Sequence, residues 1–352
     1  MNKKIIALVV ATVFSAPAFA EVSTYGIIDA AAVYASGKGQ QSDLIGYSGG
    51  LSGSRFGAKV TEDLGNGLTA VGVLEYALDT QIQASSANLK ARQQMLAVAG
   101  DFGTVAAGYL QTAAYDFAGK FDPLSGSAIS PYQSIAAGGG FLVGSTTAAA
   151  RAQRALAYIS PNISGLTVAV NYTTSLDNAL GNLGKADNAT TGLKTSAYLL
   201  SGTYVLDVLT VGAVYAGASS DNAGSTSSSD LAVGASYDLG IAKVMGTFQM
   251  ASAGSVTNTA YSLSGVMPVG EHAVAASFAM SSMDAADSNG TGLTVGYLHN
   301  LSKTATAYAA FETVSNGNAT HAYSVANNAL SAATLTNGGG STLIAIGLRK
   351  KF

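Results

Sequence analysis

The sequence lacks cysteine and tryptophan entirely, and it holds only five prolines among 352 residues. The absence of cysteine excludes disulfides as a source of stability, so the architecture itself must hold the chain together. Charged residues make up 11% of the sequence, against roughly 25% in ordinary globular domains. This shortage of charge is unusual for a protein that presents its whole surface to water.

Long hydrophobic runs are also missing. After the first twenty residues, no stretch approaches the run of about 18 or more apolar residues that a membrane helix needs. Nevertheless 48% of the residues are hydrophobic and 42 are glycine. High apolarity without helical spans is typical of a membrane β-barrel, because only every second residue of its strands has to be apolar.

The first twenty residues have the three parts of a secretory signal. Two lysines form a positive n-region, Ile5–Phe14 is an apolar h-region, and a small-x-small cleavage pattern ends at Ala20. The h-region is shorter than the run of about 20 apolar residues that crosses a bilayer. We therefore expect residues 1–20 to be a cleaved signal peptide and residues 21–352 to form one transmembrane β-barrel domain of an exported protein.

Basic residues are scarce as well. The 17 lysines and arginines fall to 15 when Lys3 and Lys4 leave with the signal peptide, against 20 acidic residues. Such a balance is no electrostatic footprint for nucleic acid. His272, His299 and His321 are far apart in the sequence and lack the Cys, Asp or Glu spacing of a metal site. We expect no nucleic-acid partner, no metal and no cofactor, and we expect the histidines to be turn and loop residues.

The clearest local pattern is the stretch Leu51–Thr80. On both sides of a turn cluster that contains Asn66-Gly67, an apolar face alternates with a face that carries charges. Successive side chains of a strand point to opposite faces, so this pattern predicts a β-hairpin. In a membrane barrel the apolar face meets lipid and the charged face meets the lumen. The charged face carries Arg55, Lys59 and Glu75, which become candidates for the pore wall.

The same two-residue alternation recurs along the chain and predicts sixteen antiparallel strands. Outside the hairpin we expect strands at 22–34, 92–99, 104–110, 152–159, 166–174, 195–205, 208–217, 231–238, 241–251, 259–267, 271–282, 291–299, 304–314 and 342–352. Residues 35–50 and 113–150 are expected to be long loops. An even number of strands, with short turns on one side and longer loops on the other, is the layout of outer-membrane barrels.

Several stretches resemble the general porins of neisserial and related beta-proteobacterial outer membranes. They are VSTYGIIDAAAVY, SGGLSGSRFGAKVTEDLGNGLTAVGVLE, RQQMLAVAGDFGTVAAG, RAQRALAYISPNISGLTVAVNY, VGYLHNLSKTATAYA and GLRKKF. The resemblance implies an all-β, 16-stranded antiparallel transmembrane barrel, a homotrimer in the outer-membrane lipid, and an inward-folded third external loop. It also implies a water-filled channel for passive diffusion of small hydrophilic solutes and ions.

In such porins, basic residues of the barrel wall face acidic residues of the inward loop. By position these correspond to Arg55, Arg92 and Arg151 in the wall and to Asp116 and Asp122 in the loop. The resemblance implies that they form a constriction with weak charge selectivity. The sequence departs from the family at Gly108-Tyr109, where many relatives have Gly-Arg. One positive charge is therefore missing, which argues against a strong anion preference.

Three other functions remain compatible with parts of the sequence. Residues 46–50 match the G-x-S-x-G pattern of a hydrolase around Ser48, but that motif needs a helix after it and the pattern here predicts a strand. The loops rich in serine and glycine are compatible with a soluble surface adhesin. A substrate-selective channel is the nearest alternative to a general pore. We expect a channel with no catalytic residues.

Overall fold

The computed structural model describes residues 20–39, 42–82, 90–176, 195–220, 226–326 and 335–352. The expected signal peptide, except for Ala20, lies outside these residues. Within them, all the named strands belong to one antiparallel sheet. No helix in this part of the chain is long and apolar enough to cross a membrane.

The strands are numbered in chain order. They are β1 (Ala20–Gly37), β2 (Asp43–Ser48), β3 (Arg55–Gly65), β4 (Leu68–Ala77), β5 (Lys90–Gly100), β6 (Gly103–Gln111), β7 (Arg151–Ile159), β8 (Leu166–Thr173), β9 (Ser175–Leu176), β10 (Thr195–Leu206), β11 (Leu209–Ser220), β12 (Ser228–Asp238), β13 (Lys243–Ala253), β14 (Val256–Val269), β15 (His272–Ser282), β16 (Gly290–Asn300), β17 (Ala305–Asn316) and β18 (Ser341–Lys351). The helices between β6 and β7 are α2 (Ala113–Phe121), α3 (Pro131–Gly138) and the 3-10 turn η1 (Ala148–Ala150).

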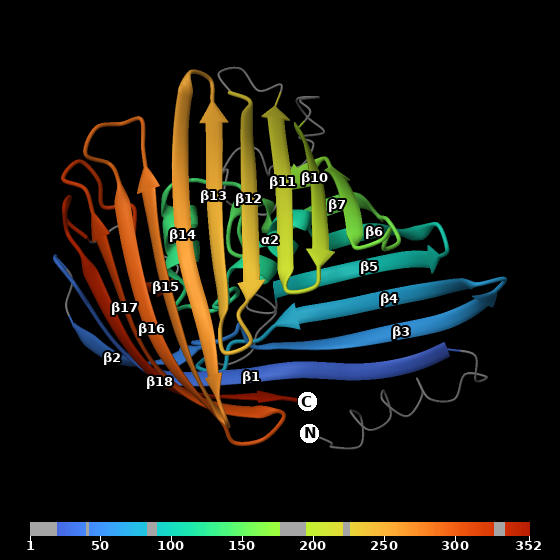
Figure 1. The fold of residues 1–352 in the computed structure, drawn as a ribbon, viewed down its shortest axis with the longest axis horizontal. Helices are drawn as coiled ribbons and strands as arrows, with labels where there is room; N and C mark the ends of the chain where they lie inside the picture. The colour runs from blue at the N-terminus through green and yellow to red at the C-terminus, as the bar shows by residue number, and fades with distance from the viewer. Residues whose placement is uncertain (1–19, 40–41, 83–89, 177–194, 221–225, 327–334) are drawn as a thin grey trace.

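The sheet closes into a barrel because its first strand pairs with its last. Ile27 of β1 lies opposite Lys351 of β18, and the register runs on to Gly37 opposite Ser341 (Figure 1). The other edge of β1 pairs with β2 and then with β3. Closure removes the open strand edges that a bilayer does not tolerate.

The barrel has the sixteen strands that the alternation predicts. The pair β2 and β3 shares one place beside β1, and the pair β8 and β9 shares one place beside β7. Counting each pair once turns the 18 strands of the sheet into a closed barrel of 16. The fold class expected from the sequence is therefore confirmed.

The predicted alternation is visible along single strands, where exposed and buried residues follow one another. In β16, Leu293, Val295 and Tyr297 are exposed and the residues between them are buried. In β4, Leu74 is 53% exposed, whereas the next residue, Glu75, is 5% exposed. An outer surface of exposed Leu, Val, Phe and Tyr is suited to lipid.

One loop prediction is wrong. Residues 35–50 contain the end of β1 at Gly37 and all of β2, Asp43–Ser48. Backbone pairing between β2 and residues 30–35 of β1 holds this segment extended. The strand is difficult to recognise in the sequence because its stability comes from this long-range pairing and not from the propensity of its own glycine-containing segment.

The segment of residues 112–150, called L3 below, lies inside the barrel. Its helix α2 packs against β10 to β13, and α3 packs against β14 to β17 (Figure 1). Both helices begin at a side-chain cap, provided by Thr112 for α2 and by Ser130 for α3. L3 leaves the wall at β6, crosses to the facing strands, and returns at β7.

Two buried carboxylates of the wall hold L3 in place. Asp230 of β12 accepts hydrogen bonds from two consecutive backbone N–H groups, beginning at Leu142, at 2.7 and 3.0 Å. Glu312 of β17 accepts from the Ser134 hydroxyl at 3.0 Å and from the Ala326 backbone N–H at 3.1 Å. Both acidic residues are fully buried, so their hydrogen bonds are removed from competing water.

Candidate functional site

Three arginines meet where L3 joins the barrel wall. Arg55 is the first residue of β3, Arg151 is the first residue of β7, and Arg92 is the third residue of β5. All three lie at strand ends on the side of the long loops, which brings them beside L3. They are the three basic wall residues that the family resemblance indicates.

Glu75 lies between two of these arginines. Arg92 Nε donates to Glu75 Oε1 at 2.6 Å, and Arg55 Nε lies 3.8 Å from Glu75 Oε2. The Glu75 side chain is only 7% exposed, so the pair is screened less than a surface ion pair. A single carboxylate thus serves two guanidinium groups, and the cluster keeps an excess of positive charge.

Tyr115 of α2 connects L3 to the arginines. The Arg151 guanidinium lies 4.8 Å from the centre of the Tyr115 ring, a distance at which cations are attracted to aromatic faces. Arg92 Nη2 donates to the Tyr115 hydroxyl at 3.4 Å, and Arg151 Nε donates to the Arg92 carbonyl at 3.2 Å. L3 therefore meets the basic residues with a tyrosine, which the sequence did not indicate.

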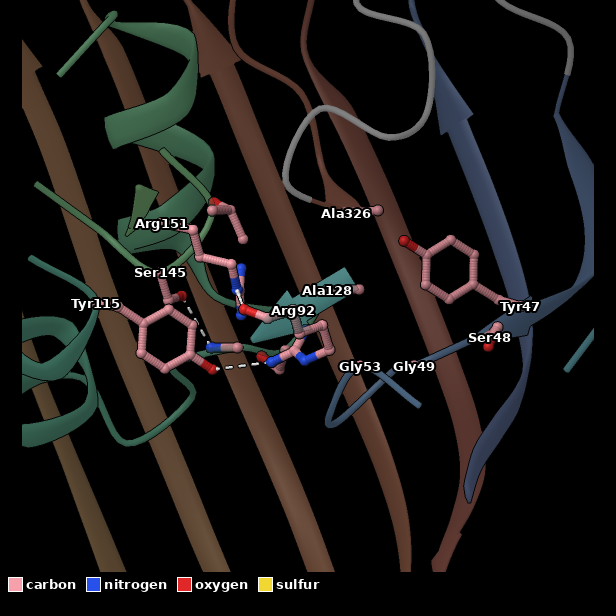
Figure 2. A pocket seen from close by; sticks show the side chains of 13 residues that line it. Tyr47, Ser48, Gly49, Gly53, Arg92, Tyr115, Ala128, Ser145, Arg151 and Ala326 are labelled. Atoms are coloured by element: carbon pink, nitrogen blue, oxygen red, sulfur yellow. Dashed lines mark hydrogen bonds between the residues drawn. The ribbon is translucent and has the colours of Figure 1, made fainter. Parts of the chain in front are cut away.

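A cavity of about 320 Å³ opens beside this cluster. Figure 2 shows Arg92, Arg151 and Tyr115 together on one side of it and Tyr47 and Ser48 of β2 across from them. Hydroxyl and guanidinium groups line much of its surface. Polar groups of this kind can replace part of the hydration shell of a small polar solute.

Two basic residues that the sequence analysis did not select lie close to Arg55. The register places Arg55 of β3 and Lys351 of β18 opposite the same residue of β1, Ile27. Arg349 lies on the same face of β18 and donates from Nη1 to the Ser52 hydroxyl at 3.1 Å. Their shared parity was visible in the sequence, but only closure of the barrel brings β18 beside β1 and so within one strand of β3.

Lys59 and Asp116 lie outside the arginine cluster. Lys59 is exposed four residues after Arg55 along β3. Asp116 is exposed on α2, and its carboxylate accepts from Gln111 Nε2 at 2.7 Å. The charge that acts on the Asp116 carboxylate is that of Lys120. In the described part of the chain, the salt bridges of the arginines go to Glu75 and not to this acid.

Asp122 does not face the arginines as the sequence analysis expects. Its side chain is turned into L3 and the residue is 3% exposed. The carboxylate accepts from the Ser130 hydroxyl at 2.6 Å and from the Leu124 backbone N–H at 2.9 Å. The residue between the helices of L3 thus stabilises the turn from α2 to α3, because it satisfies donors that would otherwise be buried without partners.

The burial of Asp122 predicts that this residue affects the pH dependence of stability but not the ion selectivity of the channel. Burial raises the pKa of the Asp122 carboxyl above its usual 3.8, against the lowering effect of its hydrogen bonds. The folded chain then holds this proton more tightly than the unfolded chain, so the stability contributed below about pH 4 is lost as the pH rises through the raised pKa. We expect the denaturation temperature of Asp122→Asn in detergent to fall less over this pH range than that of the wild type.

Two measurements check this effect. The denaturation midpoint is followed by heat-modifiable gel migration between about pH 3 and about pH 8, and the reversal potential is recorded in a salt gradient. The reversal potential of Asp122→Asn should equal that of the wild type. A changed ion selectivity, or a pH profile identical to that of the wild type, contradicts the buried structural role.

Ser48 has a structural role at the end of β2. The residue is followed by a short loop and by β3, with no helix after it. Its hydroxyl accepts from the Thr80 backbone N–H at 3.0 Å and donates to the Leu78 carbonyl at 3.4 Å. The G-x-S-x-G pattern therefore lacks the strand-to-helix turn that a hydrolase elbow needs.

A closed membrane barrel with an inward segment, and charged wall residues beside that segment, is the architecture of an outer-membrane channel. Residues 7–319 match the family described as Gram-negative porin, and the chain belongs to this family. The family resemblance found in the sequence is confirmed. The protein is a β-barrel channel of the outer membrane through which solutes diffuse passively.

Individual relatives agree with this assignment. The chain is 29% identical over 321 residues to outer membrane porin protein 32 of Delftia acidovorans, with 88% of each chain covered. Its structure is similar to an anion-selective porin from Comamonas acidovorans, with a TM-score of 0.78 and 24% identity over 95% of this chain and 100% of that one. It is also similar to OmpT of Vibrio cholerae in its trimer form, with a TM-score of 0.65 and 17% identity over 95% and 99% of the chains.

Proposed function

We propose that this porin is a general diffusion channel with a weak preference for anions. The observation that carries the proposal is the sharing of one carboxylate, Glu75, between Arg92 and Arg55. Arg151 stands next to them without a carboxylate of its own among the described salt bridges. Basic side chains around a constriction attract anions and repel cations.

The positions of the other charged residues support the same direction. Arg349 and Lys351 add positive charge from β18 near Arg55. The acids of L3 offset little of this charge, because Asp122 is buried within the segment and the positive charge of Lys120 acts on Asp116. The name of the Comamonas relative, an anion-selective porin, is consistent with this preference. The preference is expected to be weak because Tyr109 stands where many relatives carry an arginine, so one positive charge is missing.

Several further properties belong to the same proposal. Residues 1–20 act as a cleaved signal peptide, and residues 21–352 form the mature barrel. The channel assembles as a homotrimer in the outer membrane, for which the trimer form of Vibrio cholerae OmpT offers a precedent. The solutes are small and hydrophilic, and they cross unchanged, with no catalytic step.

Planar-bilayer recording tests the channel. Purified protein should insert in stable conductance steps, and in a salt gradient the reversal potential should have the sign of an anion-preferring pore. Swelling assays with neutral sugars of increasing size should give a smooth size limit without preference for one sugar. The absence of stable steps refutes the pore, and saturable transport of a single solute favours a substrate-selective channel.

A further inference from the structure

Two histidines from adjacent strands lie side by side at one rim of the barrel. His272 is the first residue of β15, His299 is the penultimate residue of β16, and the register pairs them directly. Their rings stack with centroids 4.5 Å apart and an interplanar angle of 19°. Their Nδ1 atoms are 3.0 Å apart, and the hydroxyl of Tyr297 lies 2.6 Å from His272 Nδ1. Three polar side-chain atoms therefore come together here.

This cluster lies on the outer face of the wall, away from the pore. Tyr297 shares the exposed face of β16 with Val295 and Leu293, and both histidines are half-buried beside it. The cluster adjoins the short turns that precede β15 and follow β16, and in outer-membrane barrels the short turns are periplasmic. The charged residues of these two turns are Glu271 and Lys303.

The chemistry and spacing of this cluster fit a metal ion. Neutral imidazole nitrogen is a good ligand for zinc, copper and nickel. Two nitrogens that each bind Zn²⁺ at about 2.0–2.1 Å with tetrahedral angles lie about 3.3 Å apart. The 3.0 Å between the two Nδ1 atoms, which are hydrogen-bonded to each other, is close to this separation. Because the rings are nearly parallel, a bound ion replaces this hydrogen bond and requires the rings to turn until both lone pairs point at it.

We propose that His272 and His299, with the Tyr297 hydroxyl beside them, form a binding site for a divalent transition-metal ion of the zinc and copper class. The ion bridges β15 and β16 at the periplasmic rim, and water completes its coordination. No group of three or more His, Cys, Asp or Glu in the described residues could hold a metal, so this site has two histidines only. Its affinity is therefore below that of closed four-ligand zinc sites.

The proposed site differs from the expectation that the protein binds no metal and that its histidines are turn and loop residues. His272 and His299 are separated by 26 other residues, and neither lies in a motif with metal-ligand spacing. Antiparallel pairing of β15 with β16 places them opposite each other. Bound metal should stabilise the folded barrel by mass action, and acid should release it, because only neutral imidazole coordinates a metal.

Zinc binding to the purified protein tests the site. The full chain is produced without an oligohistidine tag, extracted in detergent and titrated with ZnCl₂ by calorimetry at about pH 7.5 and about pH 5. We expect one Zn²⁺ per chain at the higher pH and none at the lower pH. His272→Gln and His299→Gln should each reduce binding below detection, and His321→Gln, which changes the exposed third histidine, should bind as the wild type does.

A second measurement separates loss of the site from loss of the fold. Zinc should raise the denaturation temperature of the wild type and of His321→Gln, but not that of His272→Gln or His299→Gln. All four proteins should give the same conductance steps. Absence of zinc binding in the wild type up to about 1 mM, a concentration at which even weak sites fill, overturns the proposal. Wild-type binding by folded His272→Gln and His299→Gln overturns it too, and neither result affects the pore function.

Discussion

Replacement of both Arg55 and Arg151 by alanine should move the reversal potential in a salt gradient toward the value for cations. These two residues are chosen because their removal leaves the close pair of Arg92 and Glu75, 2.6 Å apart, intact. Each positive charge within about 4 Å of a passing ion contributes about 1 kcal/mol in water, which corresponds to roughly a fivefold change in the permeability ratio. We expect a change of at least this size for the double variant at low salt, and a smaller one at high salt because of screening.

The control is Lys303→Ala, which removes one positive charge from an exposed residue of the turn after β16. It should leave the reversal potential unchanged. Glu75→Gln should shift the potential in the opposite direction, toward anions, because the guanidinium groups of Arg92 and Arg55 lose their shared carboxylate. A double variant with the wild-type reversal potential removes Arg55 and Arg151 from the selectivity filter.

Replacement of Glu312 by alanine should destabilise the barrel and loosen L3. The carboxylate is fully buried and accepts hydrogen bonds from Ser134 of α3 and from the Ala326 backbone N–H. Its loss removes the acceptor of the buried Ala326 N–H and one partner of the Ser134 hydroxyl, and a buried donor left unsatisfied costs about 1–3 kcal/mol. We expect a lower denaturation temperature in heat-modifiable migration, and noisier, larger conductance steps because α3 is no longer tied to β17.

Two variants keep this experiment interpretable. Glu312→Gln retains one acceptor and nearly the same volume, so it should fold and lose less stability than Glu312→Ala. Glu62→Ala removes an exposed acid from β3 and should match the wild type in both readouts. If Glu312→Ala conducts as quietly as the wild type and melts at the same temperature, Glu312 is not an anchor of L3.

The barrel could be predicted because the sequence pattern of each strand involves only neighbouring residues. Each strand needs only alternation, and the exposed Leu74 beside the buried Glu75 shows how one residue step separates lipid from protein interior. The strand β2 was missed because its extended shape depends on pairing with β1. Its six residues are too few to show a clear two-residue pattern, so no rule on neighbouring residues could find it.

The contacts of the charged residues beside L3 were predicted only in part, because they too depend on residues far apart in the chain. The arginines at 55, 92 and 151 were identified by position along the chain, but their common carboxylate and Tyr115 were not. Asp122 was expected to face the pore because its charge is visible in the sequence, yet its neighbours Ser130 and Leu124 satisfy it inside L3. Which side of a loop a carboxylate takes depends on the donors within its reach, and these come from the folded backbone.

The sequence by itself determined that this chain is an exported, sixteen-stranded outer-membrane barrel of the porin family. Strand alternation and family motifs involve residues that are close in the sequence, so both can be recognised without knowledge of the fold. Only the tertiary structure decided which charges meet. Closure sets Lys351 and Arg55 against the same residue of β1, and pairing sets His272 against His299. Such contacts join residues far apart in the chain, because register and closure are properties of the whole sheet.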